Sequence, residues 1–110
     1  MIYNRDLLNQ TYSEDEQEKF YQIRAKKKVV PISVYNNKDG EHTFLTEGQR
    51  AWLDGERYPI SADITIVGDK VILSTLGDYV SSFIIKSKDI ASTLSSLVAY
   101  INDQNKKGQA

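Results

Sequence analysis

Two turn signals, Gly68-Asp69 and Gly77-Asp78, divide the second half of the chain into three runs of β-branched and aromatic residues. Residues 64–67 and 70–74 flank the first turn, and residues 79–85 follow the second. A two-residue connection of this kind is typical of a β-hairpin, and glycine in its first position favours a type II′ turn, where φ must be positive. The pattern predicts a three-stranded antiparallel meander over residues 63–86.

A helix is predicted directly after the meander, over residues 87–104. Ser87 occupies the N-cap position and Asp89 lies in the first turn, where the helix dipole favours negative charge. Apolar residues recur at helical spacing on one face, and they are Ile90, Leu94, Leu97, Val98 and Ile101. We expect this stripe to cover one face of the sheet, so that replacing Leu94 or Leu97 by alanine costs about 2–5 kcal/mol.

The first half of the chain carries weaker signals. Ser13 and Glu16 form a capping box, which predicts a helix over residues 14–27. A β-branched and aromatic run predicts a strand over residues 29–35. Because Pro31 cannot donate a ladder hydrogen bond, we expect this strand either to lie at an edge of the sheet or to meet its neighbour past the proline.

The remaining segments show only weak hydrophobic periodicity. Residues 46–53 favour a short helix that ends before Gly55, and residues 57–60 favour a short strand. Residues 1–12 and 105–110 are expected to fray at the two ends of the domain. The order of the elements predicts one α+β domain over residues 1–110, similar to α/β folds, with the N-terminal and C-terminal helices packed on a mixed sheet.

Composition excludes several classes of function. The chain has 110 residues, of which 14 are basic and 15 acidic, and a formal net charge of −1 argues against a protein that coats nucleic acid. It has no cysteine, which excludes disulfides and thiol chemistry, and its single histidine cannot form a histidine-rich metal site. No apolar run approaches the roughly 20 residues that span a bilayer. We therefore expect a cytoplasmic protein without a membrane segment, metal or cofactor.

Few residues are candidates for catalysis. His42 is the only imidazole, and it lies in a polar segment without a serine and an acid at a recognisable spacing. An exposed loop histidine is the simpler interpretation, and a catalytic base is the alternative. The carboxylates of residues 14–16 and 18 lie on the same predicted helix as Lys19 and Arg24, which is typical of a solvated helix face rather than a metal site. No nucleophile, base and oxyanion donor combine in one motif, so the residues predict no enzyme.

Two other groups of residues could contact a ligand. The basic run Lys26, Lys27 and Lys28 is either a solvated helix end or a contact for phosphate or nucleic acid. Trp52, Tyr58 and Tyr35 either line a ligand pocket or belong to the core and its rim. The sequence leaves both alternatives open.

Several blocks resemble the phospholipase D-like effector domain of TrmB-type transcriptional regulators. The resemblance covers about residues 16–101, and its motifs are structural ones. The blocks are Phe20–Ile32, Arg57–Pro59, Ile64–Leu73 and Phe83–Leu94. The resemblance implies a regulatory domain that binds a small-molecule effector, forms a homodimer and contacts DNA only through another domain.

The chain departs from that family at informative positions. Phospholipase D enzymes require an H-x-K-x4-D motif, but after His42 this chain has Phe44 and Gln49 at the lysine and aspartate positions. The closing tryptophan of the family would fall near Asn102, and 110 residues do not hold a winged helix-turn-helix as well. The expected function is therefore a non-catalytic regulatory module. A stand-alone protein-interaction domain is the alternative, and a degenerate phosphodiesterase around His42 is the third candidate.

Overall fold

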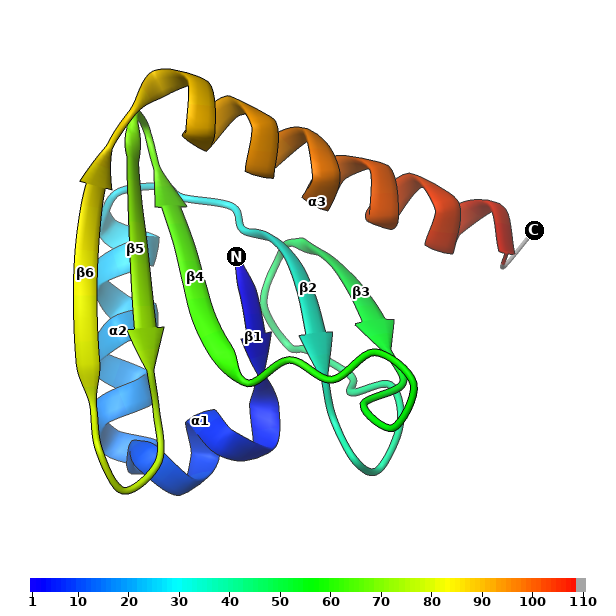
Figure 1. The fold of residues 1–110 in the computed structure, drawn as a ribbon. Helices are drawn as coiled ribbons and strands as arrows, with labels where there is room; N and C mark the ends of the chain where they lie inside the picture. The colour runs from blue at the N-terminus through cyan, green and yellow to red at the C-terminus, as the bar shows by residue number, and fades with distance from the viewer. Residues whose placement is uncertain (109–110) are drawn as a thin grey trace.

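A mixed six-stranded sheet organises the chain in a computed structural model, which describes residues 1–108 (Figure 1). The strand order is β3-β2-β1-β4-β5-β6, with the first three strands parallel and the last three antiparallel. The elements are β1 (Ile2–Asn4), α1 (Arg5–Thr11), α2 (Glu14–Lys26), β2 (Ile32–Asn36), β3 (Gln49–Leu53), β4 (Ala62–Val67), β5 (Lys70–Thr75), β6 (Ser81–Lys86) and α3 (Lys88–Gly108). The α+β class predicted from the sequence is confirmed.

The predicted meander is formed by β4, β5 and β6. β4 and β5 pair antiparallel over six residues each, and the two-residue turn between them contains Gly68 at φ 60°. Among residues 1–108, Lys28 is the only residue other than glycine that has a positive φ. The second turn residue, Asp69, therefore has a negative φ. This combination identifies the predicted type II′ turn, because a type I′ turn requires positive φ at both positions.

The core lies between α3 and the sheet. Val34 of β2, Ala51 of β3 and Val98 of α3 are buried against one another. Partly buried apolar side chains pack around them, namely Ile2, Leu53, Ile60 and Ile101. The parallel register places Ile2, Val34 and Ala51 side by side across three strands, and we call these three residues the apolar row.

The helix α3 begins at the predicted position. The Ser87 hydroxyl accepts a hydrogen bond from the Ile90 N–H at 3.2 Å, and the helix continues to Gly108. Residues 105–108 are therefore helical rather than frayed, and the rest of that prediction, residues 109–110, lies outside the described residues.

The buried face of α3 is narrower than the predicted stripe. Ala91, Val98 and Asn102 are buried, while Leu97 is 54% exposed and Ile90 is 45% exposed. Residues 91, 98 and 102 lie on one line along the helix, and the sheet contacts this line. The prediction that Leu97 belongs to the core is wrong.

The strand predicted over residues 29–35 lies in the interior of the sheet and not at an edge, and it meets its neighbours past Pro31, as the alternative expected. β2 pairs with β1 on one side and with β3 on the other, parallel to both. Pro31 does not prevent this, because it precedes the strand and its carbonyl accepts a hydrogen bond from the Gln49 N–H at 3.0 Å. The ladder therefore loses no donor that it needs.

Other predictions for residues 1–60 are also wrong. Residues 46–53 contain the strand β3 instead of a helix, with Ala51 completely buried. Residues 57–60 form no strand, because the Tyr58 N–H closes a turn onto the Asp54 carbonyl at 2.7 Å. Residues 1–12, expected to fray, form β1 and α1, and β1 lies in the middle of the sheet.

The register of α3 can be tested with one pair of alanine variants. Val98 is 3% exposed, so Val98→Ala leaves a cavity and should lower the free energy of unfolding by about 2 kcal/mol. Leu97→Ala should change it by less than about 0.5 kcal/mol, the usual range for surface positions. Chemical denaturation of both variants and the parent chain measures the two values. Equal losses would show that the stripe predicted from periodicity is the buried face.

Candidate functional site

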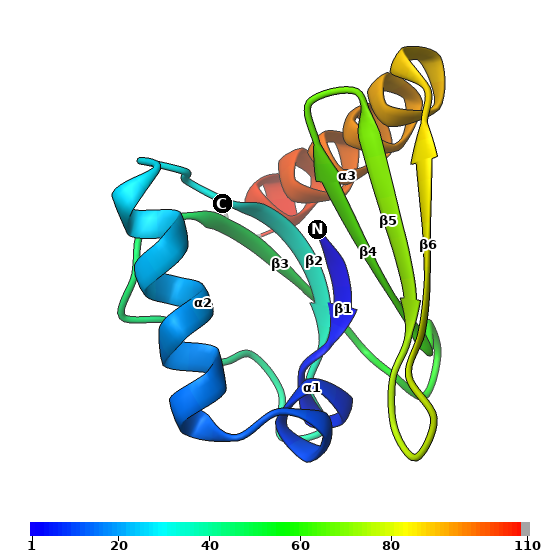
Figure 2. The ribbon, with the colours of Figure 1, turned by 90° about the vertical axis from the view of Figure 1, so that its left-hand side faces the viewer.

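The sheet face opposite α3 is aromatic. Each residue of the apolar row is followed along its strand by an aromatic residue, and these are Tyr3, Tyr35 and Trp52. The register places the three side by side on β1, β2 and β3. Successive strand residues point to opposite faces, so these rings point away from α3. Figure 2 shows α2 on this side of the sheet and α3 on the other.

The loop between β2 and β3 extends the aromatic row into a cluster. The rings of Tyr3 and Tyr35 are stacked with centroids 5.9 Å apart, and Phe44 meets Tyr35 edge-on at 5.3 Å. His42 meets Phe44 edge-on at 4.8 Å, and its backbone N–H donates to the Tyr35 hydroxyl at 2.9 Å. Local ring contacts therefore fix the loop against β2.

Arg50 brings a positive charge into this cluster. Its guanidinium carbon lies 4.2 Å from the centroid of the Phe44 ring, within the range of a cation–π contact. The guanidinium donates to the Thr46 carbonyl at 3.0 Å, the Thr46 hydroxyl at 2.9 Å and the Glu47 carbonyl at 3.2 Å. These acceptors are neutral oxygen atoms, so the hydrogen bonds position the charge without neutralising it.

The pKa values of neighbouring groups reflect this environment. Burial and the nearby Arg24 lower the pKa of Arg50, while the groups that raise it are Tyr3 and Tyr35. None of these neighbours is a carboxylate. Burial raises the pKa of Tyr3 to about 12, and burial together with the charges of Arg5 and Arg50 lowers the pKa of His42. At neutral pH the cluster therefore contains a neutral phenol, a neutral imidazole and a charged guanidinium.

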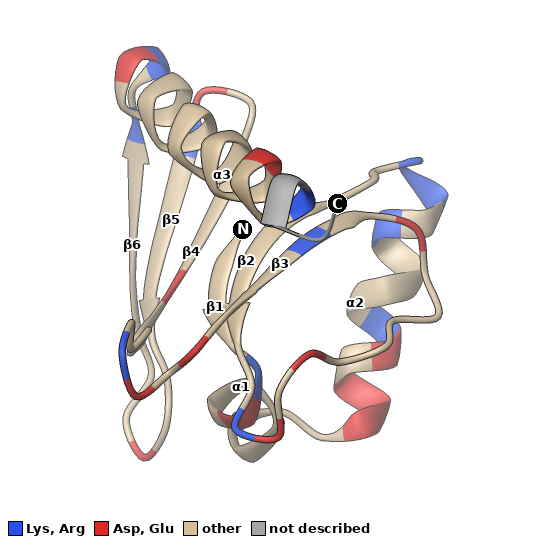
Figure 3. Ribbon diagram, turned by 90° about the vertical axis from the view of Figure 1, so that its right-hand side faces the viewer, with Lys and Arg blue, Asp and Glu red and all other residues tan. Residues whose placement is uncertain are grey.

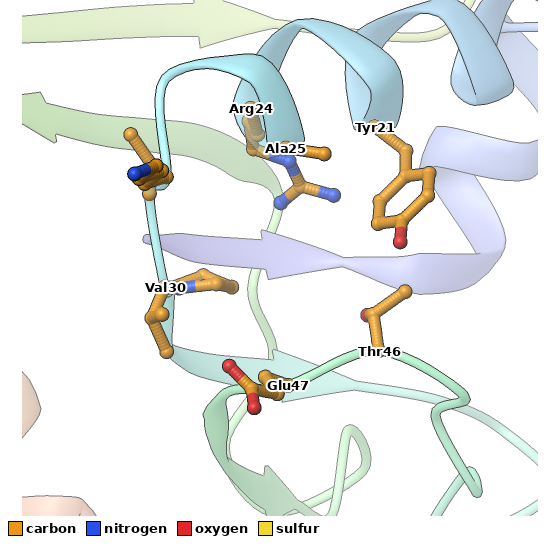
Figure 4. A pocket seen from close by; sticks show the side chains of 9 residues that line it. Tyr21, Arg24, Ala25, Val30, Thr46 and Glu47 are labelled. Atoms are coloured by element: carbon orange, nitrogen blue, oxygen red, sulfur yellow. The ribbon is translucent and has the colours of Figure 1, made fainter.

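A pocket of about 330 Å³ lies between α2 and the start of β2. Figure 4 shows Tyr21 and Arg24 directed from α2 into this pocket, with Thr46 and Glu47 on the opposite side. Its lining consists of Tyr21, Arg24, Ala25, Lys28, Val29, Val30, Pro31, Thr46 and Glu47. A second recess of about 250 Å³ shares Thr46 and is lined by Tyr35, Glu41, His42, Phe44, Gly48 and Arg50 as well. We call the two together the α2 recess.

The helix α2 is anchored mainly at its ends. The capping box of Ser13 and Glu16 is present, with both hydrogen bonds at 3.1 Å, and α2 has no buried residue. Acidic residues occupy its first turn and basic residues its last turn, so positive charge collects beside the recess (Figure 3). At its end, Lys28 adopts φ 56° while the Val29 N–H bonds back to the Arg24 carbonyl, which is a Schellman motif.

Some of the candidate residues from the sequence line the α2 recess, and others lie outside it. Tyr35 and Lys28 line the α2 recess, and His42 is half-buried in it rather than exposed. The Trp52 indole instead donates to the Asn37 carbonyl at 2.9 Å, and Tyr58 is 50% exposed. The acidic residues 14–16 and 18 are exposed, and no group of three His, Cys, Asp or Glu residues in the described chain could hold a metal ion.

Sequence reasoning missed the residues that give the recess its chemistry. The sequence pattern of residues 46–53 favours a helix, which hides the position of Arg50, and Phe44 lies in the polar segment before it. The usable signal was the order Arg50, Ala51, Trp52, Leu53, in which small or aliphatic residues alternate with large polar or aromatic ones. Tyr3 was hidden in the segment expected to fray.

Comparisons with other proteins add no identification. No protein-family model, curated protein or solved structure matches the chain. Within residues 1–108, no helix has the length and apolar character required to cross a membrane.

One buried carboxyl group lies outside the recess. Asp63 of β4 has a buried Oδ1 atom without a hydrogen-bond partner among the described residues. Burial raises the pKa of Asp63 from 3.8 to about 6, and the charge of the Met1 amino group opposes this only in part. The ionised carboxylate is thus disfavoured in the folded state, whereas in the unfolded chain water solvates it.

The burial of Asp63 predicts a pH dependence of stability. Because the folded-state pKa is the higher one, the folded protein binds more protons between pH 3.8 and about 6, so the free energy of unfolding falls as pH rises through this window. A difference from 3.8 to about 6 corresponds to about 3 kcal/mol at full effect, and solvent screening reduces the expected value to about 1–2 kcal/mol. Asp63→Asn should therefore be more stable than the parent chain at pH 7.5, and denaturation at pH 4 to 8 measures the difference. A variant whose stability parallels that of the parent at every pH would contradict the assignment.

Proposed function

We propose that the chain is a non-catalytic regulatory module that senses a small anionic ligand in the α2 recess. The observation that carries the proposal is the Arg50 guanidinium, which three hydrogen bonds to the Thr46 and Glu47 oxygen atoms hold in place within an aromatic recess near Arg24. A charge held in this way attracts an anion more strongly than a fully solvated one, because water screens it less. The resemblance to the effector domain of TrmB-type regulators supports a cytoplasmic regulatory role, with DNA contacted through another domain.

The size and lining of the recess favour a small, hydroxylated anion. A pocket of about 330 Å³ lies at the lower end of the range typical of small-molecule sites. Arg24 and Arg50 supply positive charge, whereas Glu47 in the lining of the pocket disfavours a ligand that is anionic throughout. A phosphorylated sugar combines an anionic group for the arginines with hydroxyl groups that can donate to carboxylates.

Ligand binding can be transmitted through α2. Because α2 buries none of its own residues, few contacts oppose its movement relative to the sheet. A ligand that contacts Tyr21 and Arg24 on one side and Thr46 on the other would hold α2 in one position. Binding would then order the helix, which is a signal that an attached domain can detect.

The second candidate is a stand-alone protein-interaction domain. The observation that favours it is the exposed apolar surface of α2, where Phe20 is 47% and Ile23 is 53% exposed. A partner protein covering these side chains would raise the melting temperature when no small anion does.

A thermal-shift assay with matched variants tests the proposed function. The probes are glucose 6-phosphate, AMP, citrate, inorganic phosphate and uncharged glucose. A ligand at 100 times its Kd stabilises the native state by about 2.7 kcal/mol, so at least one phosphate-bearing probe should raise the melting temperature. Arg24→Gln should abolish the rise. Lys26→Gln should retain it, because it removes the same charge from α2 outside the pocket lining.

Four results would refute parts of the proposed function. Glucose acting as strongly as its phosphate, or Arg24→Gln behaving like Lys26→Gln, would refute the anion site. Phosphodiesterase activity that disappears in His42→Ala would refute the non-catalytic assignment. Tight DNA binding by this chain alone would refute the proposal that DNA is contacted through another domain.

A further inference from the structure

The last strand of the sheet has an open edge. β6 lies at one end of the strand order and pairs with β5 in an uninterrupted register from Ser81 to Lys86. Phe83 is 65% exposed and Ile84 is 69% exposed. Soluble proteins usually protect such an edge with a proline, a bulge or a central charge, and residues 81–85 contain none of these.

One hydrogen bond fixes which backbone groups of β6 point outward. The Ser87 N–H donates to the Asp69 carbonyl at 2.8 Å, in line with the β5–β6 register. In an antiparallel ladder, alternate residues direct both backbone groups to the same neighbour. The odd-numbered residues of β6 therefore bond to β5, and the N–H and C=O groups of Ser82, Ile84 and Lys86 point away from the sheet.

The opposite edge of the sheet is better protected. β3 is shorter and presents Gln49, whose side chain accepts a hydrogen bond from Lys106 of α3 at 3.2 Å. β3 also carries the charged Arg50 within the strand. The edge that is longer and has no charge before its last residue is thus that of β6.

We infer that β6 pairs antiparallel with β6 of a second copy of this chain, about a two-fold axis through Ile84. An axis perpendicular to the sheet keeps equivalent faces of both copies together, so paired residues must lie on the same face of the strand. This condition leaves two central registers, with either Ile84 or Phe83 opposite its own equivalent.

The distribution of side chains selects the Ile84 register. It pairs Phe83 with the partner's Ile85, and places Lys86 opposite the partner's Ser82 at the ends of the strand. The Phe83 register would instead pair Ile84 and Ile85 with serines. The Ile84 register also lets the outward N–H and C=O groups of Ile84 bond to those of the partner's Ile84. A second copy therefore satisfies both the backbone and the side chains of this edge, and this inference is independent of the α2 recess.

A single-cysteine experiment tests both the pairing and its register. The chain has no cysteine, so Ile84→Cys introduces one thiol. In the inferred dimer the two equivalent Cα atoms would be about 5.5 Å apart, within the range that a disulfide spans. Mild oxidation should convert Ile84→Cys to a covalent dimer far faster than Val67→Cys, which places the thiol on a 60% exposed residue at the end of β4. Phe83→Cys should react slowly if the register is correct, and faster reaction at residue 83 than at residue 84 would overturn it.

Charged variants test the dimer without covalent chemistry. Ile84 is largely exposed, so Ile84→Lys and Ile84→Glu should keep the circular dichroism spectrum and melting behaviour of the parent chain. Sedimentation velocity should show a dimer for the parent and a monomer for each variant, since equal charges meet on the axis. An equal mixture of the two variants should form dimers again. A monomeric parent chain, or variants that stay dimeric, would overturn the inference.

Discussion

The three-residue strand β1 joins two halves of the sheet that would otherwise be separate. It pairs parallel with β2 and antiparallel with β4, so the parallel half and the antiparallel meander meet on it. Its ladder with β4 has the single register pair Ile2 and Ile64. Ile2 belongs to the apolar row and Tyr3 to the aromatic face, which means that both the core and the candidate site depend on this short strand.

The two faces of the sheet are covered very differently. On one face α3 crosses β2, β3, β4 and β5 and buries Val98 against the apolar row. On the other face α2 buries none of its residues, and the space beside it is a pocket rather than packed core. Tight packing on the first face supplies the stability of the fold, so the second face can keep polar and charged groups that a packed core would not tolerate.

The parts of the fold that follow local rules could be predicted from the sequence. The Gly68 turn needs positive φ, and Ser87 caps α3 through its own hydroxyl, so neighbouring residues were sufficient to locate the meander and the last helix. β1 is too short to show alternation, and the interior position of β2 depends on Pro31 standing just before the strand. These features are set by which strands pair, and pairing between distant segments leaves no local signal.

The candidate site was hidden for the same reason. The charged Arg50 comes to lie beside Phe44 because β3 pairs with β2 and the intervening loop folds back over Tyr35. Burying a guanidinium costs free energy unless its donors are satisfied, and here Thr46 and Glu47 supply acceptors that carry no full charge. The fold therefore holds the guanidinium at a fixed place in the α2 recess. In the proposed function, an anion that entered the recess would meet this charge where water screens it less than at a fully exposed site.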